Sequence, residues 1–357
     1  MKQRNLRLLL AATVLSASCG YPGPPKPPSL NLPQPVSDLQ AVRKGNTVYL
    51  TWTVPTETTD SLPLRHLGRT RICRNPGVSI NDCANPLGEV SKPILPVESS
   101  TRPPQRLNFT DSMSTIISAD PASQISYAVS VLNDRGRSAG TSNVVTVPAL
   151  AAASPPIDLR AEVTANGVIL RWTPIPSQET PDVTRRYRVY RRAGNNNADT
   201  IVGEAPLDSS QLVDQSFEWE RTYFYRETLV TTINLPGKAE RQFESEDTPP
   251  VKVFAHDIFP PAVPSGLQAA FSGEGQKNFI DLIWAPDTDA DLAGYNLYRH
   301  EDGKSPEKIN SQPIKTPSFR DTRVTPGGRY VYSVSAIDVR GNESAHSTEA
   351  SEAVPER

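Results

Sequence analysis

The chain has little excess charge of either sign and few of the residue types that carry catalysis. Lys and Arg number 37 against 39 Asp and Glu among 357 residues, which gives a formal net charge of −2. A basic field of the kind that holds nucleic acid is missing, so we expect no nucleic acid partner. Only four His are present, and no HExxH, GxSxG or Walker-type glycine loop occurs. We therefore expect neither an enzyme nor a bound cofactor or metal.

Cysteine and methionine are scarce, with three and two residues, whereas proline is abundant at 35. Proline interrupts helices and stiffens connections, so its abundance favours short strands, turns and extended linkers over long helices. Apolar residues make up 37% of the chain, which is enough to build packed cores and argues against global disorder. At roughly 100–200 residues for each domain, the length allows two or three domains.

The N-terminus has the pattern of an export signal. Residues 1–18 combine three basic residues with an apolar run over 8–15 that is too short to span a bilayer, and Cys19 follows. The pattern resembles a bacterial lipoprotein signal. This resemblance implies that residues 1–18 are removed and that Cys19 becomes a lipidated, palmitate-bearing N-terminus. Ser16 stands where that family prefers an aliphatic residue, so ordinary cleavage and secretion stay open as the alternative.

The resemblance also implies a cellular location and a membrane as partner. The protein would sit in a bacterial cell envelope, held at a membrane through the N-terminal lipid. An Asp after the lipidated Cys often retains such proteins in the inner membrane; Gly20 stands there instead, which favours the outer membrane. Residues 19–34 are dense in proline and are predicted to form a tether, extended as polyproline II at roughly 3 Å per residue.

The two remaining cysteines, Cys73 and Cys83, lie ten residues apart around a turn-rich stretch. Lipidation of Cys19 would leave them as a single pair, and outside the cytoplasm a disulfide is the expected state. A metal pair or a redox pair is the alternative. Neither is favoured, because no His stands at ligand spacing and there is no CxxC motif.

Self-comparison divides the chain into three copies of one pattern. In each copy a Pro and a Leu precede an alternating strand that ends in Trp, and period-two alternation places its apolar residues on one buried face. These strands end in Trp52, Trp172 and Trp284. A second strand follows at 71–74, 188–191 and 296–299, then an apolar-x-Asp element with Asp111, Asp214 or Asp321. The last alternating strands start at Ile125, Tyr223 and Tyr330.

Taken together, these residues resemble the fibronectin type III family, an all-β, immunoglobulin-like sandwich of about 100 residues. The resemblance implies three tandem sandwiches, over 35–150, 155–257 and 261–354, in a beaded, extended arrangement. Tyr223 and Tyr330 would be the corner tyrosines, whose hydroxyls bond back to the backbone. The first copy has Ile125 at that place, so we expect no corner bond there.

Several features could carry binding, and each has a structural alternative. Asp287, Asp289 and Asp291 could hold a cation, but the EF-hand spacing fails and we expect capped turns. The Arg-rich stretch 185–192 could bind an acidic glycan, or be the polar outer face of a strand. Trp219 lies outside the repeat and could stack on a sugar. About 20 extra residues in the first copy lie near the Cys73–Cys83 loop and the stretch 92–105, where we would first seek a binding surface.

The sequence therefore predicts a non-catalytic cell-surface protein that binds a partner or acts as a spacer. It would be lipid-anchored and would present its sandwiches to an unidentified protein or polysaccharide. The alternative is a secreted accessory protein that binds glycan beside enzymes of envelope or extracellular polysaccharide handling.

Overall fold

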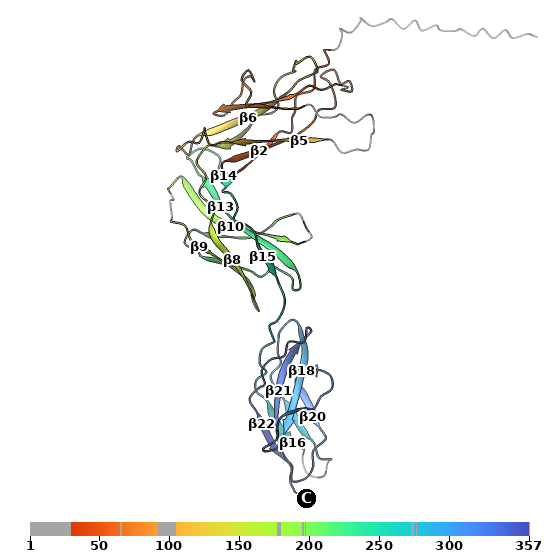
Figure 1. Cartoon of the computed structure of the whole chain (residues 1–357). Coiled ribbons are helices and arrows are strands. Elements are labelled where there is room, and N and C mark those ends of the chain that lie inside the picture. The colour runs from red at the N-terminus through yellow and green to blue at the C-terminus, as the bar shows by residue number, and fades with distance from the viewer. Residues whose placement is uncertain are drawn as a thin grey trace, which may run out of the picture. The chain divides into compact units, whose positions relative to one another are not determined.

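The structure is a computed structural model, and it describes residues 30–64, 66–91, 105–176, 180–194, 196, 198–272, 275 and 277–356. These residues form strands, turns and connecting segments, so the fold is all-β (Figure 1). No helix long and apolar enough to cross a membrane occurs in this described part. Cys19, the signal 1–18 and most of the predicted tether lie outside the described residues, as does nearly all of the stretch 92–105.

The first sandwich is built from seven strands in two sheets. One sheet holds β1 (Gln40–Lys44), β2 (Thr47–Thr53) and β5 (Arg106–Ser112). The other has the order β4-β3-β6-β7, from β4 (Gly88–Val90), β3 (Thr70–Pro76), β6 (Gln124–Val131) and β7 (Val145–Pro148). Fully buried Trp52 and Tyr127 pack between the two sheets.

The second sandwich has the same two-sheet plan, with three strands in one sheet and five in the other. One sheet has the order β12-β9-β8, from β12 (Gln211–Asp214), β9 (Gly167–Thr173) and β8 (Ile157–Thr164). The other places β10 (Val183–Ala193) between β11 (Thr200–Pro206) and β13 (Thr222–Ile233), and β13 also pairs with β14 (Arg241–Glu244) and β15 (Val251–Phe254). Although Arg226-Glu227 interrupts the apolar alternation, β13 stays paired with β10 from end to end.

The third sandwich again consists of a three-stranded and a four-stranded sheet. The first has the order β16-β17-β20, from β16 (Gln268–Phe271), β17 (Ile280–Ile283) and β20 (Ser318–Asp321). The second has the order β19-β18-β21-β22, from β19 (Glu307–Lys308), β18 (Leu292–His300), β21 (Arg329–Asp338) and β22 (Ala350–Ala353). The first and third sandwiches thus share a split into three and four strands, which is the immunoglobulin-like plan of the prediction.

The residues that define the repeat occupy the places that the pattern predicts. Trp52, Trp172 and Trp284 are buried in their cores. The Tyr223 hydroxyl accepts from the Glu218 amide at 2.9 Å, and the Tyr330 hydroxyl accepts from the Thr325 amide at 3.1 Å. Both corner tyrosines are therefore confirmed. The beaded, extended arrangement stays a prediction.

Candidate functional site

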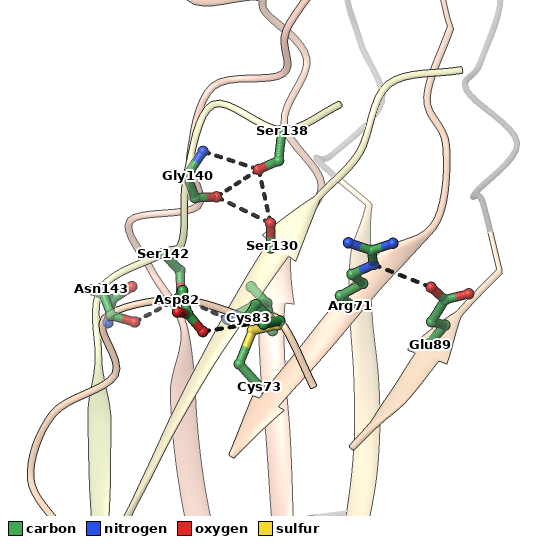
Figure 2. Close-up of a disulfide and its surroundings, with 12 residues drawn as sticks. Arg71, Cys73, Asp82, Cys83, Glu89, Ser130, Ser138, Gly140, Ser142 and Asn143 are labelled. Carbon is green, nitrogen blue, oxygen red and sulfur yellow. Dashed lines mark hydrogen bonds and ion pairs between the residues drawn. A yellow bond between two sulfur atoms is a disulfide. The ribbon is translucent and has the colours of Figure 1, made fainter. Parts of the chain in front are cut away.

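In the first sandwich a disulfide closes the loop that follows strand β3. Cys73, buried in the middle of β3, is bonded to Cys83, and their Cα atoms are 5.3 Å apart (Figure 2). Asn75 Nδ2 donates to the Ser79 carbonyl at 3.0 Å, and Ser126 Oγ of β6 donates to the Gly77 carbonyl at 2.6 Å. The loop is thus fixed by one covalent bond and by hydrogen bonds at its tip.

A polar pocket of about 260 Å³ opens beside this disulfide. Around Cys73 its lining residues are Arg74, Asn75, Ile80, Asn81, Asp82 and Asn85. Three of these are amides, and an Asn side chain both donates and accepts hydrogen bonds. The pocket therefore suits a neutral ligand that is rich in hydroxyl groups better than an apolar one.

The arginine of the pocket is not free to bind an anion, because it is already paired. Arg74 Nη1 lies 2.9 Å from Asp111 Oδ2 on β5, and the Tyr127 hydroxyl donates to the same oxygen at 2.6 Å. Burial, together with that hydrogen bond, raises the pKa of Tyr127. The phenol stays protonated, and this bonded trio ties β3, β5 and β6 together behind the pocket.

An ion-paired carboxylate stands on the neighbouring edge strand. Glu89 of β4 lies 2.9 Å from Arg69 Nη1 and 3.3 Å from Arg71 Nε, and Figure 2 shows the Arg71 contact. Hydrogen bonds from these arginines lower the pKa of Glu89. The three charges keep this exposed edge polar, which discourages pairing with another strand.

A second pocket of the same sandwich, about 400 Å³, lies where the chain enters it. Its walls are Asn31, Leu62, Pro63, Leu64, His66 and Asp134. The entering segment pairs with the loop after β2, because the Gln34 amide donates to the Glu57 carbonyl at 3.0 Å and the Thr59 amide to the Leu32 carbonyl at 2.9 Å. The end of the predicted tether therefore forms part of this wall.

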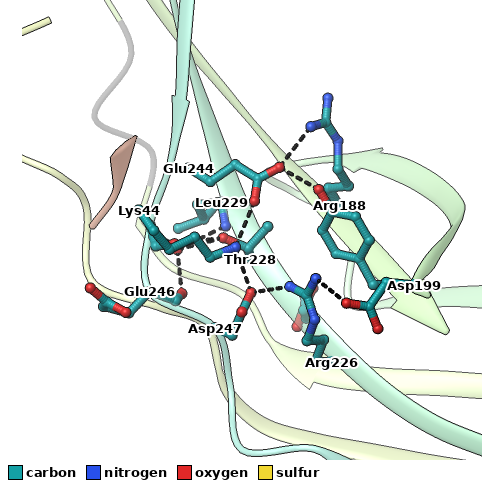
Figure 3. A network of polar contacts seen from close by, with 12 residues as sticks. Lys44, Arg188, Asp199, Arg226, Thr228, Leu229, Glu244, Glu246 and Asp247 are labelled. Carbon is teal, nitrogen blue, oxygen red and sulfur yellow. Dashed lines mark hydrogen bonds and ion pairs between the residues drawn. The ribbon is translucent and has the colours of Figure 1, made fainter. Parts of the chain in front are cut away.

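The Arg-rich stretch of β10 is largely neutralised by acids on neighbouring segments (Figure 3). Arg188 Nη1 lies 2.7 Å from Glu244 Oε1, and Arg188 Nη2 lies 2.6 Å from Glu204 Oε1. The Arg226 guanidinium lies over the Tyr190 ring, 4.0 Å from its centroid, and pairs with Asp199 and Asp247. Arg186, Arg188 and Arg192 therefore lie on the polar outer face of β10, the structural alternative weighed for this stretch, whereas Arg185 and Arg191 lie on its other face.

The acidic turn of the third sandwich caps its own backbone, as expected. Asp287 Oδ1 accepts from the Asp289 amide at 3.0 Å. A separate feature is that Asp291 meets Asp257 and Asp338, with one carboxylate oxygen of each within 4.8 Å of the others. Arg340 Nη1 occupies this cluster, 3.0 Å from Asp257 and 3.4 Å from Asp291, and supplies its positive charge.

Trp219 is held in an aromatic cluster. Its ring meets Phe217 edge-on, with centroids 4.7 Å apart, and lies 6.0 Å from the ring of Phe259. The indole is only partly exposed and packs against the core of the second sandwich. These contacts favour packing over a platform for a sugar.

Sequence reasoning missed that three of the repeated residues contact one another. The Asp of each apolar-x-Asp element accepts hydrogen bonds from an Arg that lies towards the end of the second strand and from a Tyr of the last strand. The trios are Arg74–Asp111–Tyr127, Arg191–Asp214–Tyr225 and Arg299–Asp321–Tyr332. Their threefold recurrence at fixed places in the repeat was a signal that could have identified them.

Comparison with known proteins gives partial matches, and no family model matches the chain. Over 114 residues it is 40% identical to an amylopullulanase of Thermoanaerobacterium saccharolyticum, a match that covers 32% of this chain and 8% of that enzyme. Over 249 residues it is 27% identical to exoglucanase B of Cellulomonas fimi, covering 67% of this chain and 20% of the enzyme. The chain thus spans at most a fifth of the length of either.

Solved structures of tandem sandwiches also resemble it. The FN1–FN3 domains of chicken CNTN1 match 90% of this chain and 99% of that one, at 13% identity and a TM-score of 0.27. A two-domain fibronectin type III segment of chicken tenascin matches 56% of this chain and all of that one, at 18% identity and a TM-score of 0.35.

Proposed function

We propose that this chain, whose three sandwiches resemble fibronectin type III domains, is a non-catalytic binding and spacer protein of the cell envelope, held there by a lipid on Cys19. The sandwiches supply a stable scaffold, and loops on such scaffolds usually carry the contacts. The observation that carries the proposal is the disulfide-closed loop after β3, with its polar pocket.

A polysaccharide is the partner that this pocket fits best. Its amides and Asp82 can exchange hydrogen bonds with sugar hydroxyls, and Arg74 is engaged with Asp111. The partial relatives are named as an amylopullulanase and an exoglucanase, which are glucan-degrading enzymes. The proposal therefore places the protein beside such enzymes, as a chain that contacts their substrate.

Gel electrophoresis through polysaccharide tests the binding. Wild type should be slowed in a native gel that contains pullulan or soluble cellulose derivatives, compared with a plain gel. The double variant N81A/N85A should lower the apparent affinity about thirtyfold, since each of the two lost hydrogen bonds contributes about 1 kcal/mol. The matched control N108A changes an exposed Asn on β5, in the opposite sheet, and should migrate as wild type.

Two outcomes would contradict the proposed site or the proposed ligand. Equal retardation of wild type and N81A/N85A would show that the polysaccharide does not bind in this pocket. Absence of retardation by any of the polysaccharides would overturn the polysaccharide as partner, and the loop would then be tested against envelope proteins.

A further inference from the structure

The core of the second sandwich contains a carboxyl group. On β13 the side chains of Tyr223, Tyr225 and Leu229 point inward, and strand alternation places Glu227 in the same row. Glu227 is 0% exposed, and neither of its carboxylate oxygens has a hydrogen-bond partner among the residues that the structure describes. Buried polar groups are nearly always bonded, so this group needs an explanation.

The other two sandwiches show what this position normally holds. In each sandwich the backbone amide at this place donates to a hydroxyl on the segment that follows the strand. The bonds run from Val129 to Ser142, from Glu227 to Thr248 and from Val334 to Ser347, at 3.0, 3.0 and 3.1 Å. The three residues are therefore equivalent, and an acid replaces a buried valine only in the second sandwich.

No positive charge near Glu227 compensates it among the described residues. The polar side chains that face the core from β10 are Arg185, Tyr187 and Arg191. Arg191 is paired to Asp214 of β12 at 2.7 Å, Arg185 lies towards the opposite end of β10 with contacts of its own, and the Tyr187 hydroxyl accepts from the Ile175 amide.

On β12 the buried carboxylate of Asp214 is the partner of Arg191, and on β14 Arg241, which has contacts of its own, lies opposite Ile233, six residues along β13 from Glu227. The remaining strands around this core bring only apolar side chains or neutral polar groups to that face. From β8 these are Leu159, Ala161 and Val163, from β9 Val168, Leu170 and Trp172, and from β15 Val251 and Val253. The Trp172 indole N–H has no partner, but Trp52 and Trp284 share this feature, so it belongs to the fold and is not specific to Glu227.

Such a site tolerates the neutral acid much better than the carboxylate, because an unpaired buried charge is costly. Burial raises the pKa of Glu227 to about 8. In the unfolded chain the group loses its proton near pH 4.5, whereas in the folded chain it keeps the proton until about pH 8. The folded state binds the extra proton between these values, so stability falls as pH rises through that window and levels off above it.

We propose that Glu227 makes the second sandwich the pH-sensitive member of the three. The protonated acid holds the core closed, and its ionisation, with no partner to receive the charge, shifts the sandwich towards opening. The first and third sandwiches lack this response because valine fills the same place.

Amide hydrogen exchange of the full chain, followed by mass spectrometry and corrected for intrinsic exchange rates, tests this. In wild type the opening equilibrium of β10 and β13 should rise roughly 50-fold between pH 6 and pH 8, as expected for one proton released over that window. E227Q and E227V should remove that rise, with slower exchange at pH 8. The matched control E240Q changes an exposed carboxyl of the same sandwich and should keep it.

The converse variant V334E should install the same pH dependence in β18 and β21 of the third sandwich and leave β10 and β13 unchanged. The proposal is overturned if wild type and E227Q show the same pH dependence in β10 and β13. Because E227Q preserves the shape of the side chain, it keeps the test valid even if V334E does not fold.

Discussion

At the scale of single residues, the most repeated device is the Arg–Asp–Tyr trio. Asp111, Asp214 and Asp321 are buried, and each carboxylate would be expensive to bury alone. The arginine supplies the opposite charge and the tyrosine a hydrogen bond from within the core. Each trio thereby joins three strands from both sheets of its sandwich.

Removing one acid from a trio should destabilise only its own sandwich. D321A leaves the Arg299 charge and the buried Tyr332 hydroxyl without their shared partner, and we expect a loss of about 3 kcal/mol. The loss in free energy of unfolding is measured by urea titration of the full chain, with hydrogen exchange of the β18 and β21 amides as the signal for the third sandwich. The control D281A breaks an exposed pair with Arg320 and should cost under about 1 kcal/mol; equal losses for both variants would contradict the role of the trio.

At the scale of elements, the disulfide loop combines a buried anchor with an exposed tip. Cys73 is buried, although strand alternation places it on the face of β3 opposite to the core residue Ile72, whereas residues 75–79 and 81–82 are exposed. The covalent bond returns the chain to the sheet ten residues later. The pocket thus has a wall whose position does not depend on packing of the loop itself.

Opening this loop should lower stability and loosen its tip. C73A/C83A removes the cross-link, and the chain-entropy model gives a loss of about 2–3 kcal/mol for a loop of this length. Urea unfolding of the first sandwich should register the loss, and amides of residues 75–82 should exchange faster in the native state. Unchanged exchange at the tip would show that its hydrogen bonds alone hold the loop.

The sequence allowed the strands to be predicted, but not the contacts between distant elements. Alternation and Trp spacing located the strands that lead to the Trp residues, β2, β9 and β17, and the strands that follow them, β3, β10 and β18. The corner tyrosines followed from their place in the pattern. The meeting of Asp257, Asp291 and Asp338 was not predictable, because it joins three segments far apart in the chain. Glu227 was visible as an interruption, but only the pairing of β13 shows that the strand continues and buries it.

At the scale of the whole molecule, the chain consists of repeated modules, each with its own closed core. A module of this kind adds length to the chain and offers loops for contacts. In this proposal the attachment to a membrane comes from the N-terminal segment and not from the modules. The predicted lipid on Cys19 would supply that attachment, and the proline-dense residues that follow would separate it from the first sandwich.

The mass of the intact mature protein, isolated from the membrane fraction of a bacterium that processes lipoproteins, tests the anchor. We expect a chain that begins at Cys19, carries a lipid increment and lacks two hydrogens because of the disulfide. C19A should move to the soluble fraction, whereas C73A/C83A should stay with the membrane. An unlipidated mass, or C19A retained in the membrane fraction, would contradict lipid anchoring and favour the secreted alternative.

The buried tryptophans have a spectroscopic consequence. Each sandwich holds one core indole whose N–H has no hydrogen-bond partner in the described part of the chain, at Trp52, Trp172 and Trp284. A dry, unbonded indole emits at short wavelength, whereas partly exposed Trp219 should emit further to the red. Replacing all but one of the four by Phe would give a chain whose fluorescence reports a single sandwich, so the opening of each could be followed in turn without any added label.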